Sequence, residues 1–150
     1  MSQVIADEQL RYDTVVQPIQ KWTTARSMLH LYPGQNIKDD RLPALLCQQK
    51  QPTFITIDHD FWNSRLCDSH YCIVYFALDD AQQELVPDLL RRLFKHPDFN
   101  TRAKRMGKVI RISTTGIQFY QLEGSLIHIA SMKRNARLSE PSARAGSPRK

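Results

Sequence analysis

Two continuous apolar runs constrain the fold most strongly. Residues 53–57 read Thr-Phe-Ile-Thr-Ile, residues 71–76 read Tyr-Cys-Ile-Val-Tyr-Phe, and neither alternates with polar residues. A strand without alternation is buried on both faces, which is typical of a parallel sheet covered by helices on each side. Shorter runs at residues 4–6 and 109–112 predict two further strands. The sequence therefore predicts an α/β fold with a mainly parallel sheet.

The segments between these runs have helical or turn patterns. Leucines at helical spacing make residues 79–95 the clearest helix, and helices are also expected within residues 9–20, 37–50, 61–69 and 98–106. Residues 21–31 are ambiguous between strand and helix. A terminal hairpin is expected from residues 117–122 and 126–130, which flank Glu123-Gly124.

Length and charge set the domain organisation. The chain has 150 residues, enough for one domain, which we place at residues 1–132. Residues 133–150 form a basic tail rich in Arg, Ser, Ala, Pro and Gly, too polar to bury a core, so we expect disorder there. Residues 1–90 hold 12 acidic and 7 basic side chains, whereas residues 91–150 hold 3 and 14. This asymmetry suits metal binding at one end and polyanion binding at the other.

Three cysteines and the absence of an export signal predict a reducing cytoplasm as the location. No apolar run approaches the roughly 20 residues that span a bilayer, so no membrane association is expected. Cys47 and Cys72 lie in apolar runs and are interpreted as buried small hydrophobic residues. No spacing of Cys and His residues indicates structural zinc.

Carboxylates follow the predicted strands. One pair ends the first strand, a second pair ends the 53–57 strand, and a third opens the helix between them. In parallel sheets ligands gather at the carboxyl ends of the strands, so these groups are expected to converge there. Oxygen ligands suit Mg²⁺ or Mn²⁺, which would favour phosphodiester hydrolysis; the alternative is that they cap helices and end loops. The candidates are Asp7, Glu8, Asp39, Asp40, Asp58 and Asp60.

These residues carry a resemblance to a known family. The resemblance is carried by Ile-Ala-Asp-Glu-Gln-Leu at 5–10, Ile-Lys-Asp-Asp-Arg-Leu at 37–42, the Thr-x-Asp-x-Asp-Phe block at 56–61, and the segments at 107–112 and 116–119. In these segments the chain resembles short PIN-like nuclease domains, which are similar to VapC-type toxins. The resemblance covers about residues 4–122 and implies a three-layer α/β/α sandwich and a metal-dependent ribonuclease. It implies metal-binding and catalytic roles for Asp7, Asp40 (or Asp39), Asp58 and Asp60, with Thr56 supporting the site by hydrogen bonding. The chain departs from the family in one respect: it lacks the further helical Glu of full-length PIN domains.

The first functional hypothesis is therefore a Mg²⁺-dependent (or Mn²⁺-dependent) endoribonuclease, with an antitoxin partner and a homodimer expected by resemblance. The alternatives are a non-catalytic PIN-like module that binds nucleic acid or a partner protein, and a receiver-like phospho-switch. The last also needs a lysine after a late strand, whereas Lys108 precedes its strand. The RNA backbone would be held by basic residues in the second half of the chain, although a solvated helix face is an equally good interpretation of 102–105. These residues are Arg91, Arg92, Lys95, Arg102, Lys104, Arg105, Lys108 and Arg111.

Overall fold

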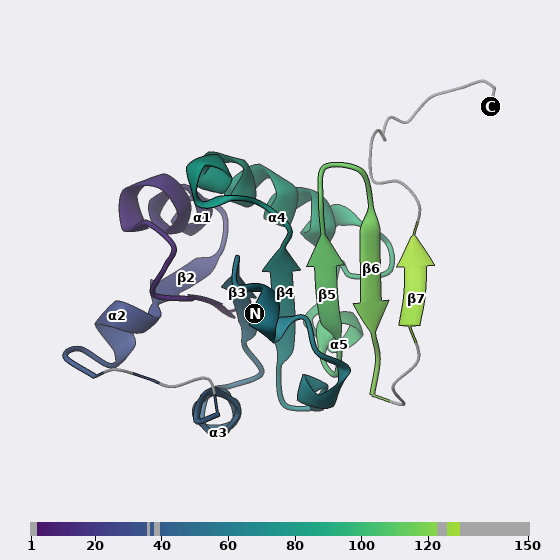
Figure 1. The fold of residues 1–150 in the computed structure, drawn as a ribbon, viewed down its shortest axis with the longest axis horizontal. Helices are drawn as coiled ribbons and strands as arrows, with labels where there is room; N and C mark the ends of the chain where they lie inside the picture. The colour runs from purple at the N-terminus through teal and green to yellow at the C-terminus, as the bar shows by residue number, and fades with distance from the viewer. Residues whose placement is uncertain (1–2, 36, 38–39, 123–125, 130–150) are drawn as a thin grey trace.

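A computed structural model describes residues 3–35, 37, 40–122 and 126–129 of the chain. In these residues seven strands form one sheet in the order β2-β1-β3-β4-β5-β6-β7 (Figure 1). The first five strands are parallel, and β6 and β7 are antiparallel to their neighbours. The strands are β1 Gln3–Ala6, β2 Thr24–Ser27, β3 Thr53–Thr56, β4 Cys72–Phe76, β5 Val109–Ile112, β6 Ile117–Tyr120 and β7 Leu126–Ile129.

Alternate side chains of the strands enter two hydrophobic cores. In β1, Val4 packs into one core and Ile5 into the other, and Ile55 and Phe54 divide in the same way in β3. The first core is completed by side chains of η1, α1 and α4, and the second by side chains of α2, α3 and η2. Because both faces are covered, the central strands β3 and β4 are buried along their whole length, and the expected three-layer α/β/α sandwich is confirmed.

The helices are shorter than their sequence patterns suggest. The α-helices are α1 Gln17–Gln20, α2 Met28–Leu31, α3 Leu42–Cys47, α4 Val86–Lys95 and α5 Arg102–Arg105. A π-helical turn, η1 Tyr12–Val16, precedes α1, and 3₁₀ segments form η2 His59–Phe61, η3 Ser64–Leu66 and η4 Asp80–Leu85. The helix expected over 79–95 is thus a 3₁₀ segment followed by α4, and Pro87 at its first turn fits the start of α4.

Residues 98–106, which were expected to form one helix, contain much less helix than predicted. Only α5 is helical there, capped by the Thr101 side chain, which accepts a hydrogen bond from the Lys104 N–H. Phe99 is fully buried in the first core, and burying this ring holds residues 97–100 in a turn. The segment expected at 61–69 is likewise two 3₁₀ turns rather than one helix.

The topology separates two edges of the parallel sheet. The chain leaves β1, β3, β4 and β5 at the carboxyl edge and enters them at the opposite, amino edge. Helix α4 follows β4 and leads back through α5 to the start of β5 (Figure 1). Within the described residues no helix is long and apolar enough to cross a membrane. The tail at 133–150 lies outside the described residues.

Candidate metal site at the carboxyl edge of the sheet

Asp7 is the first residue beyond β1 and is fixed by its backbone. Its N–H donates to the carbonyl of Ile55 at 2.9 Å, which extends the pairing of β1 with β3 by one residue. Its carbonyl accepts a hydrogen bond from the N–H of Leu10 at 3.0 Å, which closes a turn. Leu10 is itself buried, so the turn is anchored in the first core. The Asp7 carboxylate is therefore held at the strand end.

A chain of hydrogen bonds links three of the predicted site residues. The fully buried Thr56 hydroxyl donates to Asp7 Oδ2 at 2.7 Å and accepts from the N–H of Asp58 at 2.9 Å. Asp58 Oδ1 in turn accepts from the N–H of Asp60 at 3.0 Å and caps η2. The supporting role expected for Thr56 is present in the geometry. The Thr-x-Asp spacing is needed because the same hydroxyl serves both aspartates.

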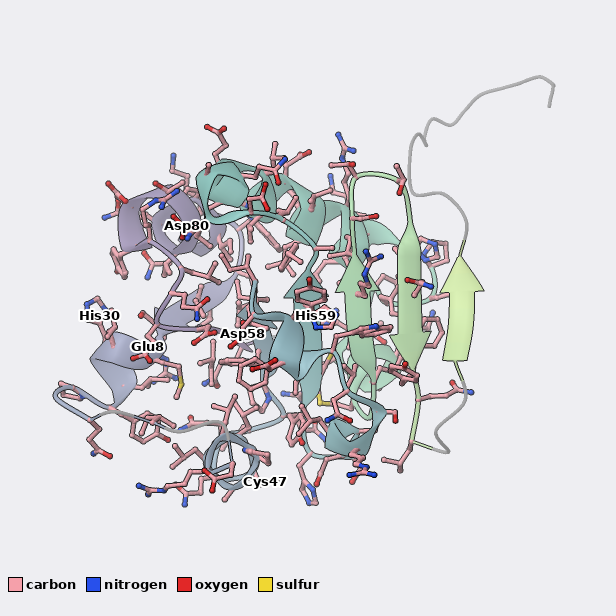
Figure 2. The ribbon with its side chains drawn as sticks, viewed as in Figure 1. Glu8, His30, Cys47, Asp58, His59 and Asp80 are labelled. Carbon is pink, nitrogen blue, oxygen red and sulfur yellow. The ribbon has the colours of Figure 1, made fainter. Side chains whose placement is uncertain are left out.

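The carboxylates of Asp7 and Asp58 line a pocket of about 60 Å³. Asp58 and Glu8 lie on the same side of the molecule, near the end of β3 and beside α2 (Figure 2). A volume of this size holds several waters or a hydrated cation. The pocket is lined by Asp7, Glu8, Gln9, Met28, Leu29, Gln35, Ile37, Leu42, Phe54, Asp58 and Phe61.

The electrostatics of Asp7 distinguish it from the other carboxylates. Burial raises the pKa of Asp7 from 3.8 to about 6, with smaller upward contributions from Asp58 and Glu8. The hydrogen bonds from Thr56 and from the backbone of Glu8 act in the opposite direction, because they stabilise the ionised form. A carboxyl that is desolvated and also repelled by like charges is stabilised by a cation.

The donor set fits Mg²⁺ or Mn²⁺ rather than a closed protein cage. Asp7 and Asp58 provide oxygen donors at one pocket, with Glu8 exposed at its rim. Among the described residues, no three carboxylates bring their oxygens within 4.8 Å of one another. Mg²⁺ is commonly held by one or two carboxylates while keeping several of its waters, so two aspartates beside a hydrated pocket suffice.

Other predicted ligands lie elsewhere or outside the described residues. Asp60 and Asp40 are exposed, and neither lines the pocket. Asp40 precedes α3, which begins at Leu42, and the side chain at the cap position is Arg41. Asp39 lies outside the described residues. The structure thus brings Asp7 and Asp58 together and leaves Asp60 and Asp40 at the surface.

Two residues that sequence reasoning missed hold the loop after β1. The buried Gln83 side chain accepts from the N–H of Arg11 at 2.8 Å and donates to the carbonyl of Gln9 at 3.0 Å. Asp80 Oδ1 accepts a second hydrogen bond from Gln83 at 2.8 Å, and Asp80 Oδ2 pairs with Arg11 at 3.1 Å. The available signal was the acidic pair Asp79-Asp80, which follows the 71–76 strand as Asp58 follows the 53–57 strand.

The prediction that Arg105 binds RNA is wrong. Its side chain is only 1% exposed, and its Nη1 donates to the carbonyl of Phe99 at 2.8 Å. Its Nε donates to Thr53 Oγ1 at 3.4 Å, and its guanidinium lies 3.8 Å from the centre of the Phe94 ring. The apolar stem of arginine can be buried when its polar head is satisfied, as it is here.

The basic group around α5 lies at the amino edge, away from the pocket. The N–H of Ile73 donates to the carbonyl of Lys108 at 3.1 Å, and the N–H of Gly107 donates to the carbonyl of Tyr71 at 3.0 Å, both at the start of β4. Lys104, which is exposed, donates to the carbonyl of Pro97 at 2.8 Å. This basic region therefore does not face the carboxylates, because α4 carries the chain back across the sheet before α5 begins.

The remaining predicted RNA contacts are spread over other surfaces. Arg91 lies over the Trp22 ring at 5.9 Å, and Arg92 pairs with Asp88 one turn away at 3.1 Å. Arg111 donates to Gln118 across the β5–β6 pair at 3.2 Å. These three cations each have a protein partner, and none of them lines the pocket.

Of the two cysteines predicted to be buried, one is buried and the other is exposed. Cys72 is fully buried in the first core as expected, whereas Cys47 is exposed at the end of α3 (Figure 2). The apolar run at 44–47 belongs to a helix whose inner face is formed by Leu42, Leu45 and Leu46. The last residue of the run therefore falls outside the buried face. His70, which has no partner at a recognisable spacing in the sequence, lies against Asp68.

Comparisons of the chain with models of protein families, with curated proteins and with solved structures find no match.

Proposed function

We propose that this protein is a Mg²⁺-dependent (or Mn²⁺-dependent) endoribonuclease in which Asp7 and Asp58 hold the cation at the carboxyl edge of the sheet. The observation that carries the proposal is the hydrogen-bonded chain from Asp7 through Thr56 to Asp58, which ends at a pocket of about 60 Å³. A buried threonine that fixes the Asp7 carboxylate and the backbone of Asp58, where the two carboxylates repel each other, is expected where a cation is to be bound.

Each residue has a separate task in this proposal. When bound, the cation lowers the pKa of a water and stabilises charge on the scissile phosphate. Thr56 fixes the orientation of the Asp7 carboxylate through its hydrogen bond to Oδ2. Glu8, exposed at the rim, is placed to accept the proton from the attacking water. The apolar wall formed by Phe54, Phe61 and Leu42 limits water around the carboxylates.

RNA as the substrate rests on charge and on the resemblance to PIN-like nucleases. Residues 91–150 hold 14 basic and 3 acidic side chains, a net charge of +11, which favours binding of a polyanion. Because the basic residues near α5 lie at the amino edge, they would add affinity for the RNA backbone rather than place the scissile bond. Action as a toxin, an antitoxin partner and a homodimer remain predictions from the resemblance.

The decisive test is cleavage of single-stranded RNA by purified Asp58→Asn and Asp7→Asn variants with Mg²⁺ or Mn²⁺ present. Each variant removes one metal ligand, so we expect a loss of at least about 100-fold, larger than is usual for residues that only orient a ligand. Asp13→Asn is the matched control, because Asp13 is an exposed acidic residue of η1 outside the pocket. Wild-type cleavage rates in both site variants would overturn the proposal.

A non-catalytic binding module is the second candidate. The observation in its favour is that, among the described residues, only two carboxylates besides exposed Glu8 line the pocket. Mn²⁺ titration followed by paramagnetic broadening separates the two candidates. An enzyme gives saturable binding that Asp58→Asn removes, whereas a module of this kind gives no binding near neutral pH and no cleavage.

A further inference from the structure

A second group of donor atoms lies at the amino edge of the sheet, whereas the pocket lies at the carboxyl edge. The Cys47 sulfur, an Asp68 carboxylate oxygen and a His70 ring nitrogen all lie within 4.8 Å of one another. Cys47 is the last residue of α3, whereas Asp68 and His70 belong to the connection between η3 and β4. Residues far apart in sequence thus bring three different donors together at one point of the surface.

The connection that carries two of these donors is well ordered by hydrogen bonds. Asp68 Oδ1 accepts from the backbone N–H of His70 at 2.9 Å and lies 2.7 Å from His70 Nδ1. The buried Tyr71 ring follows, and its hydroxyl donates to the carbonyl of Leu66 at 2.6 Å. The positions of Asp68 and His70 are therefore coupled before any ion binds, which reduces the entropy lost on binding.

Cys47, the third donor, belongs to a helix that is anchored in the second core. Leu45 and Leu46 of α3 are buried in the second core, the core that also contains Tyr71. The helix and the connection are therefore packed on the same set of side chains. Cys47 projects from the end of that helix to the surface, which leaves its sulfur accessible to an ion from solvent.

The donor chemistry selects a class of ion. Sulfur, imidazole nitrogen and carboxylate oxygen together suit a borderline cation such as Zn²⁺ or Co²⁺ and do not suit Mg²⁺. Tetrahedral zinc with bonds of about 2.0 to 2.3 Å places neighbouring donors about 3.3 to 3.6 Å apart. The Cys47 sulfur has to approach the other two donors, and Asp68 Oδ1 and His70 Nδ1, now 2.7 Å apart, have to exchange their hydrogen bond for bonds to the ion; side-chain rotations are enough for both changes. Water would complete the fourth position.

We propose that Cys47, Asp68 and His70 form a second metal site, specific for Zn²⁺ or a similar borderline ion, that clamps the end of α3 to the start of β4. The site is independent of the proposed carboxylate site in both position and chemistry. Binding of an ion there displaces the proton of the Cys47 thiol.

The test is titration of the full chain with Co²⁺ as a spectroscopic probe for Zn²⁺. We expect one equivalent of Co²⁺ to give visible d–d bands and a sulfur-to-cobalt charge-transfer band in the near ultraviolet, both abolished by added Zn²⁺. Cys47→Ser should remove the charge-transfer band, and His70→Gln should weaken binding at least about tenfold. Both side chains are exposed, so far-ultraviolet circular dichroism should be unchanged.

Cys67→Ser is the matched control, because Cys67 is a half-buried cysteine beside Asp68 that is not part of the donor group. It should bind Co²⁺ with the wild-type spectrum. Asp7→Asn and excess Mg²⁺ should also leave the bands unchanged, which separates this site from the carboxylate pocket. The proposal is overturned if Co²⁺ gives no charge-transfer band, if Cys47→Ser retains it, or if Cys67→Ser loses it.

Discussion

Each edge of the parallel sheet desolvates one charged side chain, but the two charges have different surroundings. At the amino edge, the Arg105 guanidinium is buried but satisfied, with hydrogen bonds to Phe99 and Thr53 and an aromatic ring beneath it. At the carboxyl edge, the Asp7 carboxylate is desolvated and faces other acidic groups, so its pKa is raised to about 6. At the amino edge, hydrogen bonds and the ring stabilise the Arg105 charge. At the carboxyl edge, desolvation and repulsion destabilise the Asp7 charge, and a bound cation would stabilise it.

This difference shows where function is to be sought. A satisfied buried charge needs no ligand, because the protein already supplies its partners. A buried charge whose nearest charged neighbours have the same sign is retained only where something else compensates for it. Removing the charge of Arg105 and removing the charge of Asp7 should therefore change the free energy of unfolding with opposite signs.

The largest expected effect is at the amino edge. Arg105→Ala should lower the free energy of unfolding by about 3 kcal/mol, because it leaves a cavity and a buried carbonyl of Phe99 without its donor. Urea denaturation of the two proteins measures this difference.

Lys104→Ala is the neighbouring control. Its ammonium group is exposed and makes one hydrogen bond, to the carbonyl of Pro97, so the change should be within about 0.5 kcal/mol. Equal effects of the two substitutions would mean that the buried guanidinium is not part of the stable core.

At the carboxyl edge, Asp7→Asn should instead stabilise the metal-free protein at neutral pH, by up to about 3 kcal/mol for a pKa raised from 3.8 to about 6. The folded state binds the Asp7 proton more tightly than the unfolded state. Stability of the wild type contributed by this group therefore falls as the pH rises from about 4 to about 6. Asparagine does not titrate and avoids this loss.

Thermal denaturation of wild type and Asp7→Asn at pH 4 and pH 7, with a chelator present, tests the sign. The two proteins should be close in stability at pH 4 and separate at pH 7. Addition of Mg²⁺ at pH 7 should then reduce the difference in melting temperature between the two proteins, because the cation stabilises only the wild type. A destabilised Asp7→Asn protein at pH 7 would contradict the comparison between the edges.

A smaller effect is expected at the residue that links the carboxylates. Thr56→Val should destabilise by about 1 kcal/mol, because a buried hydroxyl with two hydrogen bonds is replaced by a methyl group. It should also raise the pKa of Asp7 further, since the hydrogen bond from Thr56 lowers that pKa. Carboxyl titration by NMR measures the shift, and Thr56→Ser, which keeps the hydroxyl, should leave it near its wild-type value.

The smallest expected effect concerns the exposed ion pair above the loop. Arg11→Ala should change the free energy of unfolding by less than about 0.5 kcal/mol, because Arg11 and Asp80 are paired in solvent. Gln83→Ala should lower the free energy of unfolding by about 2 kcal/mol more than Arg11→Ala does. It leaves the N–H of Arg11 and the carbonyl of Gln9 without their buried partner. Urea denaturation of the pair distinguishes the contribution of the ion pair from that of the buried amide.

The strands β1, β3, β4 and β5 could be predicted from the sequence because burial leaves an apolar run, as in Cys72–Phe76. Strand β2 lies in the segment that was ambiguous between strand and helix, and half of its residues are exposed. Asp7 and Asp58 could be placed at one edge, since parallel strands end together. The sequence did not show that Arg105 and Lys108 lie at the other edge, although α4 must return the chain to the start of β5. The exposure of Cys47 and its proximity to His70 depend on tertiary packing that no local pattern encodes.

The link through Gln83 has a consequence for the order in which the protein folds. Its hydrogen bonds to Gln9 and Arg11 join residues 74 and 72 positions apart in the chain. Contacts of such long range require a large loop to close first, and they therefore form late. The loop that carries Asp7 is completed only when η4 docks on it. A nascent chain that has emerged only as far as β4 thus has its strands but lacks this closure of the pocket.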